Sequence, residues 1–339
     1  MIQLFNINNN VVDTTEFSNL LHDKVVDKFE QKFSNYVGSK YACSINSATN
    51  AIFLSLLNKD VTVKLPSMIP PVVANAILTS GNTIEFIDDI DWVGHSYILH
   101  QFDDYKIIDS AQKLEKTQFQ TECNPEDLMI FSFYPTKPLG GADGGMIVTD
   151  NEDVYKRVKT MRLHGINKDI WDRFTAKVPS WEYDVVEAGF KYNMPDVTAA
   201  IGLGQLEQAE LFRKERQKAV EFYYSKLSEL KMIDLPITKI PFEDHAWHLF
   251  PIVLNEKSTI SRNEFIDKLS EAGIGTSVHY KPLHQMTYYK TKYNLKVDDF
   301  PNAEKTWQGN VSLPLFPFME KEDLEYICDT IKYILIGKF

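Results

Sequence analysis

Short apolar segments alternate with amphipathic ones between Gly38 and Leu163, and this alternation constrains the possible fold more than any other feature. The apolar segments predict strands at Tyr41–Ile45, Val61–Leu65, Thr83–Ile87, Lys106–Ile108, Leu128–Phe133 and Met146–Thr149. Helical spacing of apolar residues predicts helices at Thr14–Val37, Asn50–Leu57, Val72–Ser80 and Asp153–Leu163. Strands that alternate with helices are typical of α/β proteins, so we expect a mainly parallel sheet with helices on both faces.

The pattern changes in the second half of the chain. Residues 166–191 have no clear period and predict a long ordered loop, and a long helix is expected from Asp196 onward. The elements predicted beyond it are a strand at Leu249–Leu254, a helix at Arg262–Ala272, a strand at Gly275–Tyr280 and a helix at Lys321–Ile336. We therefore expect a large α/β domain at 1–235 and a smaller α+β domain at 236–339.

Composition excludes several classes of protein. Acidic residues outnumber basic ones by 47 to 36, and a net charge of −11 disfavours binding to nucleic acid. The apolar runs are too short to span a bilayer, and the first residues do not resemble a secretory signal. The cysteines Cys43, Cys123 and Cys328 lie far apart, which argues against a disulfide framework or a metal site. We expect an enzyme of the reducing cytoplasm.

Three polar motifs follow predicted strands. Ser47-Ala48-Thr49 begins a helix, where free N–H groups favour a phosphate, although a simple helix cap would explain the same residues. Asp109 ends an apolar strand and suits a cap, a metal ligand or a partner for a protonated ring nitrogen. Lys137 leaves another apolar strand and precedes four glycines within residues 140–145, which fits either a reactive lysine or a surface lysine beside a hairpin.

None of these three motifs points to a particular ligand alone, but the three together do. In open α/β sheets, ligands bind beyond the carboxyl ends of the strands, so the three motifs are expected at one crevice. A phosphate cradle, a carboxylate and a lysine suit pyridoxal 5′-phosphate, whose phosphate, ring nitrogen and aldehyde need these three partners.

At these residues the sequence resembles the DegT/DnrJ/EryC1/StrS family of sugar aminotransferases, which are fold type I enzymes dependent on pyridoxal phosphate. The similar blocks run nearly end to end and include NSAT at 46–49, IIDSAQ at 107–112, FSFYPTK at 131–137, GGADGGMIVTD at 141–150, MRLHGINKD at 161–169, GFKYNMPDVTAAIGLGQLE at 189–207 and GIGTSVHYKPLH at 273–284. The resemblance implies a seven-stranded type of sheet, shortened in this chain, flanked by helices.

The resemblance also implies roles at the cofactor. Lys137 would bond the cofactor aldehyde and then move protons as base and acid. Asp109 would pair with the ring nitrogen, and Gln112 would contact the ring hydroxyl. The phosphate would be held by Ala48, Thr49 and Ser132. A segment of the partner subunit, Lys191-Tyr192-Asn193, would complete the phosphate site through Asn193, so a homodimer with shared active sites is expected.

The implied reaction is ping-pong transfer of an amino group from L-glutamate to a nucleotide-linked keto-deoxysugar for surface polysaccharide. The blocks containing His164 and Lys191 resemble members that aminate C4 of a 4-keto-6-deoxyhexose. Residues expected at the sugar nucleotide are His164, Lys191, His279 and Tyr280. Each of them would also be explained as an ordinary packed or solvent-facing polar residue.

Two departures from the family pattern leave another interpretation open. Pro70 stands where the family has an aromatic residue against the cofactor ring, and residues 92–105 replace a longer strand–helix segment. A strand fits at His95–His100, but a crossover helix does not. These departures favour a non-catalytic relative that serves as a binding or scaffold protein. Lys137 argues against this alternative, and also against the dehydrating members, which have histidine in its place.

Overall fold

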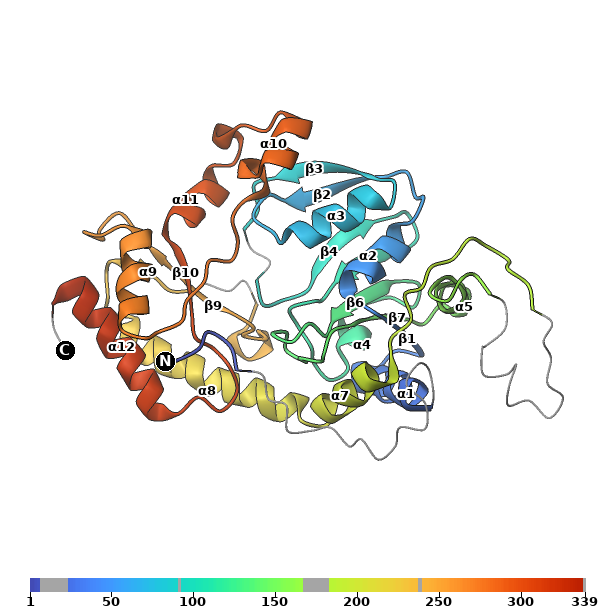
Figure 1. The fold of residues 1–339 in the computed structure, drawn as a ribbon, viewed down its shortest axis with the longest axis horizontal. Coiled ribbons are helices and arrows are strands. Elements are labelled where there is room, and N and C mark those ends of the chain that lie inside the picture. The colour runs from blue at the N-terminus through green and yellow to red at the C-terminus, as the bar shows by residue number, and fades with distance from the viewer. Residues whose placement is uncertain (7–23, 91–92, 167–182, 237–239, 338–339) are drawn as a thin grey trace.

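The computed structural model describes residues 1–6, 24–90, 93–166, 183–236 and 240–337. Figure 1 shows a sheet with helices on either side, joined to a second group of elements by the long helix α8. The elements of the sheet-containing part are α1 (Lys24–Val37), β1 (Tyr41–Ile45), α2 (Ala48–Leu56), β2 (Thr62–Pro66), α3 (Pro71–Thr79), β3 (Thr83–Ile87), β4 (Tyr97–Gln101), β5 (Lys106–Asp109), α4 (Gln118–Glu122), β6 (Leu128–Ser132), β7 (Gly145–Thr149), α5 (Glu152–Met161) and α7 (Asp196–Glu207).

The strands pair in the order β1-β7-β6-β5-β4, and β2 pairs with β3 in a separate two-stranded sheet. Among the described residues, β5–β6 and β2–β3 are parallel, whereas β1–β7, β6–β7 and β4–β5 are antiparallel. The predicted α/β class is confirmed, but the sheet is mixed rather than mainly parallel. The antiparallel direction of the β4–β5 pair has a physical reason. Only residues 102–105 connect these strands, whereas a parallel connection needs a dozen residues or more.

The expected strand at His95–His100 is present as β4, and no helix lies between β4 and β5 in the described stretch 93–166. Strand β4 is antiparallel to β5, so it runs away from the edge of the sheet at which β5 ends. This hairpin places the first residue of β4, Tyr97, opposite the last residue of β5, Asp109.

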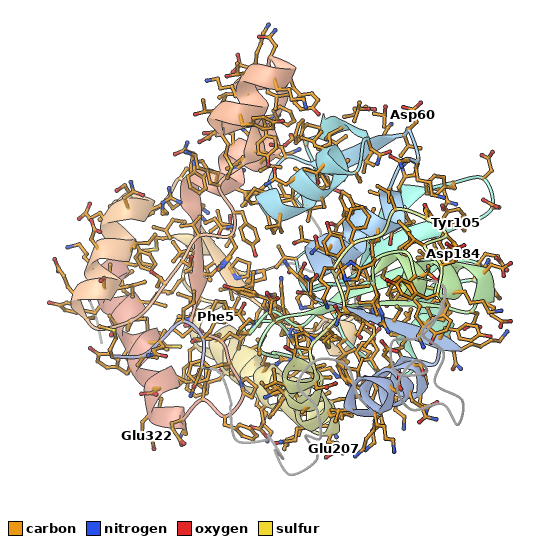
Figure 2. All side chains as sticks on the ribbon, turned by 45° about the vertical axis from the view of Figure 1, so that its right-hand side comes forward. Phe5, Asp60, Tyr105, Asp184, Glu207 and Glu322 are labelled. Carbon is orange, nitrogen blue, oxygen red and sulfur yellow. The ribbon has the colours of Figure 1, made fainter. Side chains whose placement is uncertain are left out.

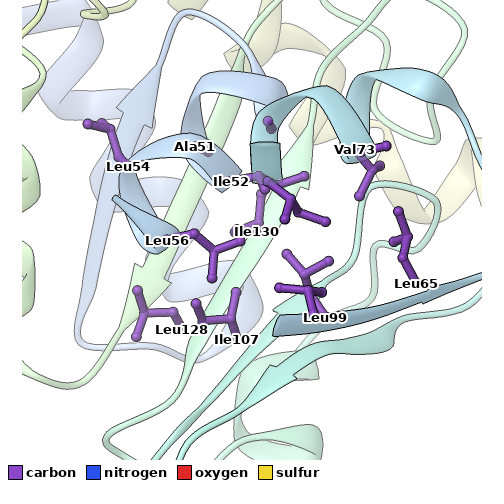
Figure 3. Close-up of a cluster of buried hydrophobic side chains, with 14 of the residues drawn as sticks. Ala51, Ile52, Leu54, Leu56, Leu65, Val73, Leu99, Ile107, Leu128 and Ile130 are labelled. Carbon is purple, nitrogen blue, oxygen red and sulfur yellow. The ribbon is translucent and has the colours of Figure 1, made fainter. Parts of the chain in front are cut away.

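Apolar side chains on both faces of the sheet explain why helices cover each of them. One buried cluster joins α2 and α3 to the strands through Ala51, Ile52, Leu54, Leu56, Leu65, Val73, Leu99, Ile107, Leu128 and Ile130 (Figure 3). On the opposite face, the rings of Phe29 and Phe33 in α1 pack on Phe131 and Phe133. Alternate residues of β6 therefore enter different cores, as the period of a strand requires.

The second group of elements contains α8 (Ala209–Leu227), β8 (Ile233–Asp234), β9 (Phe250–Leu254), α9 (Arg262–Glu271), α10 (Thr287–Tyr293), α11 (Pro301–Gly309), β10 (Asn310–Leu313) and α12 (Lys321–Ile336). Strands β8, β9 and β10 form an antiparallel sheet whose core also includes Val220 and Tyr223 of α8. The proposed domain boundary at 235/236 stays a prediction. Among the described residues, no helix is long and apolar enough to cross a membrane.

Two sequence predictions about single elements were wrong in detail. The long helix expected from Asp196 is interrupted at Gln208, so α7 and α8 are separate helices. Residues 275–280 do not form a regular strand, because Ser277 makes only an isolated bridge with Ser312 and Ile274 pairs with Ile2 of the N-terminus. The first part of the helix predicted at Thr14–Val37 and most of the loop predicted at 166–191 lie outside the described residues.

Candidate active site

A cavity of about 580 Å³ opens at the edge of the sheet where β1, β5 and β6 end. It brings together most of the residues predicted from the sequence, namely Ala48, Thr49, Asp109, Gln112, Ser132, Lys137, His279 and Tyr280. His164, Lys191 and Asn193 are not among the residues that line it. Among the described residues, no group of three or more His, Cys, Asp or Glu side chains is arranged to hold a metal ion.

The first wall of the cavity is the start of α2. The Ser47 hydroxyl accepts a hydrogen bond from the Asn50 N–H at 3.1 Å and caps the helix. Ala48 and Thr49 line the cavity, and their N–H groups precede the first intrahelical hydrogen bond. Gly145 of β7 allows the strand to approach them, because a Cβ atom there would lie 2.5 Å from the Ala48 nitrogen. This arrangement suits an anionic group at the positive end of a helix.

The second wall is the end of β5, where the Asp109 side chain is 3% exposed. Its Oδ1 accepts from the Ala111 N–H at 2.8 Å, and its Oδ2 accepts from the Tyr97 hydroxyl at 2.7 Å. Burial raises the pKa of Asp109, while these two donors and the charge of Lys137 oppose the rise. Gln112 lies beside it, with its side-chain oxygen accepting from the Gly94 N–H at 2.9 Å.

The third wall is the turn after β6, which carries Lys137. The Lys137 N–H donates to the Tyr134 carbonyl at 2.8 Å, so a tight turn directs the residue back to the cavity. Burial lowers the pKa of Lys137 to about 8, and the carboxylate of Asp109 only partly opposes this shift. A lysine with this pKa has a substantial neutral fraction near neutral pH, as a nucleophile or a general base needs.

The predicted substrate residues divide into two groups. His279 and Tyr280 line the cavity, and the His279 Nδ1 lies 2.8 Å from the Ser312 hydroxyl. Burial, and then the charge of Lys137, lowers the pKa of His279 to about 4, so its ring is neutral at pH 7. His164 is exposed and lies away from the cavity lining, with its N–H bonded to the Phe190 carbonyl.

The segment Lys191-Tyr192-Asn193 runs beside the end of β1 in the same chain. Asn193 forms an isolated antiparallel bridge with Ile45, and the Asn46 N–H donates to the Tyr192 carbonyl at 2.7 Å. The Lys191 ammonium donates to the Asn193 side-chain oxygen. A role for Asn193 at a phosphate site therefore needs a second subunit and stays a proposal.

Pro70 lines the cavity and precedes α3, so the departure from the family pattern lies at the site itself. The N-terminal residue Phe5 also lines the cavity, and its ring stacks on His248 with 6.2 Å between centroids. Figure 2 shows Phe5 between the sheet-containing part and the C-terminal elements. An aromatic ring thus reaches the cavity from a segment that sequence analysis did not consider.

Sequence analysis also missed Tyr97 and two buried residues on the other side of Lys137. Arg216 and His248 line a small adjoining cavity with Lys137, and burial lowers the pKa of Arg216 to about 10. Helical spacing could have indicated that Arg216 is buried. It lies on the same face of α8 as the buried residues Phe212, Ala219, Val220 and Tyr223. Tyr97 offered no such signal, since only the β4–β5 hairpin places it against Asp109.

An α/β fold with a half-buried lysine, a strand-end carboxylate and a helix N-terminus around one cavity defines a transferase of the type that uses pyridoxal phosphate. The chain belongs to the DegT/DnrJ/EryC1/StrS aminotransferase family, whose sequence profile matches residues 5–94 and 103–332. The unmatched residues between these two stretches include all of β4.

Relatives with known names span nearly the whole chain. The spore coat polysaccharide biosynthesis protein SpsC of Bacillus subtilis is 31% identical, with 96% of this chain and 94% of SpsC covered. The UDP-4-amino-4,6-dideoxy-N-acetyl-beta-L-altrosamine transaminase of Campylobacter jejuni is 29% identical, with 92% and 90% covered. The pyridoxal phosphate form of the putative sugar aminotransferase Spr1654 from Streptococcus pneumoniae superposes with a TM-score of 0.80 at 22% identity, covering 98% and 99%.

These comparisons confirm the predicted family, the aminotransferase class and the fold type I architecture. They also confirm pyridoxal phosphate as the cofactor of this family. The domain boundary and the roles of individual site residues stay predictions.

Proposed function

We propose that this sugar aminotransferase transfers the amino group of L-glutamate to a nucleotide-linked keto-deoxysugar, at C4 of a 4-keto-6-deoxyhexose. The product would serve surface polysaccharide biosynthesis. The observation that carries the proposal is the meeting of Lys137, Asp109 and the start of α2 around one cavity. A scaffold protein would have no chemical need for a half-buried lysine whose pKa is lowered to about 8.

The residues present fit pyridoxal phosphate. When bound, this cofactor supplies an aldehyde that carries the amino group and a ring that withdraws electrons. Lys137 would bond the aldehyde and afterwards hold and return the proton of the amino donor through its Nζ. Asp109 would hold a proton at the ring nitrogen. The N–H groups of Ala48 and Thr49 and the Ser132 hydroxyl would bind the phosphate, and Gln112 would contact the ring hydroxyl.

The choice of substrates has separate support. The name of the Campylobacter relative places an amino group at C4 of a UDP-linked 4,6-dideoxy sugar. His279 and Tyr280 offer polar atoms to a sugar at the cavity, and the neutral ring of His279 suits a hydrogen bond rather than a charge pair. Arg216 is a buried cation beside Lys137 and supports an acidic amino donor such as L-glutamate.

We also propose that the protein is a homodimer and acts in the cytoplasm. The segment Lys191-Tyr192-Asn193 lies beside the end of β1, and β1 ends three residues before the start of α2, where we expect the phosphate to bind. In a twofold dimer, Asn193 of each chain would contact the phosphate in its partner, and Lys191 and His164 would approach the sugar nucleotide of that shared site.

The amine of Lys137 gives a pH test of the site. The rate at which the cofactor-free chain bonds pyridoxal phosphate is expected to rise about tenfold per pH unit below pH 8 and to level off above it. Only the neutral amine attacks the aldehyde, so the rate follows its fraction. Stopped-flow absorbance measures the rate, and Nα-acetyl-lysine corrects for ionisation of the cofactor. A midpoint near the usual lysine pKa of about 10.4 would contradict the assignment.

The reaction is tested by the absorption spectrum of the chain with pyridoxal phosphate. We expect the yellow band of the lysine-bound cofactor, its loss with excess L-glutamate and the release of one 2-oxoglutarate per site. A UDP-linked 4-keto-6-deoxyhexose should restore the band, whereas the 3-keto isomer should not. Restoration by the 3-keto sugar alone would refute C4 transfer, and the absence of any yellow band would favour the non-catalytic binding protein.

A further inference from the structure

We propose that Tyr97 is a positioning residue that holds the Asp109 carboxylate in place and keeps the shared proton on the ring nitrogen of the cofactor. This inference rests on the proposed function, because it takes Asp109 as the partner of that nitrogen. Tyr97 itself lines the cavity, next to the carboxylate that it contacts.

The contact is fixed by backbone register as well as by the side chains. Tyr97 and Asp109 are direct partners across the antiparallel β4–β5 pair. The Tyr97 hydroxyl donates to Oδ2 at 2.7 Å, while the Ala111 N–H donates to Oδ1 at 2.8 Å. Each oxygen of the carboxylate therefore has one donor from the protein, and the plane of the group is set before any ligand binds.

The donor comes from the part of the chain that departs from its family. The family profile matches residues 5–94 and 103–332, so Tyr97 lies in the unmatched stretch. Because residues 102–105 are too few for a parallel crossover, β4 folds back on β5 and its first residue meets the end of β5. The shortened connection thus supplies a phenol where the functional carboxylate sits.

The chemical effect follows from the basicity of Asp109. Burial favours the protonated acid, whereas a hydrogen bond donated to the carboxylate favours the anion. Burial and the neighbouring carboxylate raise the pKa of Tyr97 well above its usual value, so the phenol stays a donor at neutral pH. The charged group facing Asp109 from the β6 turn, Lys137, acts in the same direction. A less basic Asp109 leaves the proton on the ring nitrogen, where it makes the ring a better electron acceptor.

The test uses Tyr97→Phe in the full chain, loaded with pyridoxal phosphate labelled with ¹⁵N in the ring. In the unsubstituted chain, the ¹⁵N signal should be that of a protonated ring nitrogen. In Tyr97→Phe, the signal should move toward the value of an unprotonated ring nitrogen. The ratio of protonated to unprotonated nitrogen should fall about tenfold, the effect expected from loss of one hydrogen bond to a charged group. We also expect kcat to fall about tenfold, while KM for the keto sugar changes little.

Tyr36→Phe is the matched control. The Tyr36 hydroxyl donates to the Glu210 carboxylate at 2.5 Å, and Tyr36 does not line the cavity. This substitution removes the same kind of hydrogen bond and should leave the ¹⁵N signal unchanged. Tyr97→Leu provides a second variant without the donor.

The outcomes separate the two proposals. An unchanged ¹⁵N signal in whichever donor-free variant binds the cofactor would overturn the role of Tyr97. Failure of both variants to fold would also overturn it, because Tyr97 would then be a structural residue. If the unsubstituted chain fails to form the yellow band, the proposed function fails instead.

Discussion

Lys137→Ala is expected to lower transamination by at least about a thousandfold, the scale on which loss of a general acid or base slows a reaction. The variant loses both the amine that would bond the cofactor and the group that would move the proton. Its fold should persist, because Lys137 sits in a turn after β6 and faces a cavity rather than the core. Release of 2-oxoglutarate measures activity, and circular dichroism measures the fold.

Two further lysine variants separate charge from reactivity. Lys137→Arg keeps a cation but cannot release its proton near neutral pH, so it should be as inactive as Lys137→Ala. Lys64→Ala removes an exposed lysine that lies 3.9 Å from Glu85 on β3, and activity should be unchanged. Transamination retained by Lys137→Ala would overturn the proposed role of this residue.

Arg162→Met is expected to lower the free energy of unfolding by about 3–5 kcal/mol, the range for removing one member of a buried ion pair. The Arg162 side chain is 1% exposed and donates to the Glu30 carboxylate and, at 2.8 Å, to the Ser44 carbonyl. Glu30 also accepts from the Ser44 N–H at 2.8 Å. The variant would leave Glu30 buried without its cation. Urea unfolding followed by circular dichroism measures the loss.

The matched control is Arg157→Met, because Arg157 pairs with Glu187 at 2.8 Å while both side chains are more than two-fifths exposed. That exposed pair should contribute no more than about 1 kcal/mol. Equal losses from the two substitutions would show that burial of the Arg162 pair does not matter.

The pH dependence provides a second check on this ion pair. Burial alone would raise the pKa of Glu30, but Arg162 and Ser44 outweigh it and lower that pKa in the folded chain. The contribution of Glu30 is therefore present above the usual carboxyl pKa and is lost only as pH falls through the lowered value. In Arg162→Met, Glu30 would take a proton more readily, so the stability deficit should be larger at pH 8 than at pH 5. A deficit independent of pH would contradict this account.

The ion pair also connects stability with the site. Ser44 lies on β1 just before the Ser47 cap of α2, and Glu30 and Arg162 hold that strand from α1 and from the end of α5. Loosening of Ser44 would move the helix start that is expected to bind the phosphate. Weaker cofactor binding by Arg162→Met would therefore be explained by movement of β1 and of the helix start that follows it.

Local patterns predicted most of the elements and the three walls of the site. Residues 128–131 are apolar on both faces and predict a buried strand, so Ser132 and Lys137 are expected where the chain leaves the sheet. Asp109 was predictable in the same way, as a carboxylate directly after the apolar residues of β5. The antiparallel pairing of β4 with β5 follows from the short connection at residues 102–105. The antiparallel pairing of β7 with β1 and β6 was not predictable, because local periodicity does not contain the direction in which a strand enters the sheet.

The sequence by itself determined the family, the order of helices and strands, and the presence of a lysine, a carboxylate and a helix start at strand ends. Similar sequence blocks along the chain carry the family, whereas short-range spacing encodes the elements and the residues at their ends. The tertiary structure decided that Tyr97 meets Asp109, that Arg162 pairs with Glu30, and that Arg216 lies beside Lys137. These contacts join different elements of the chain, and Glu30 and Arg162 are 132 residues apart. They exist only once the hairpin direction and the packing of the helices on the sheet have been set.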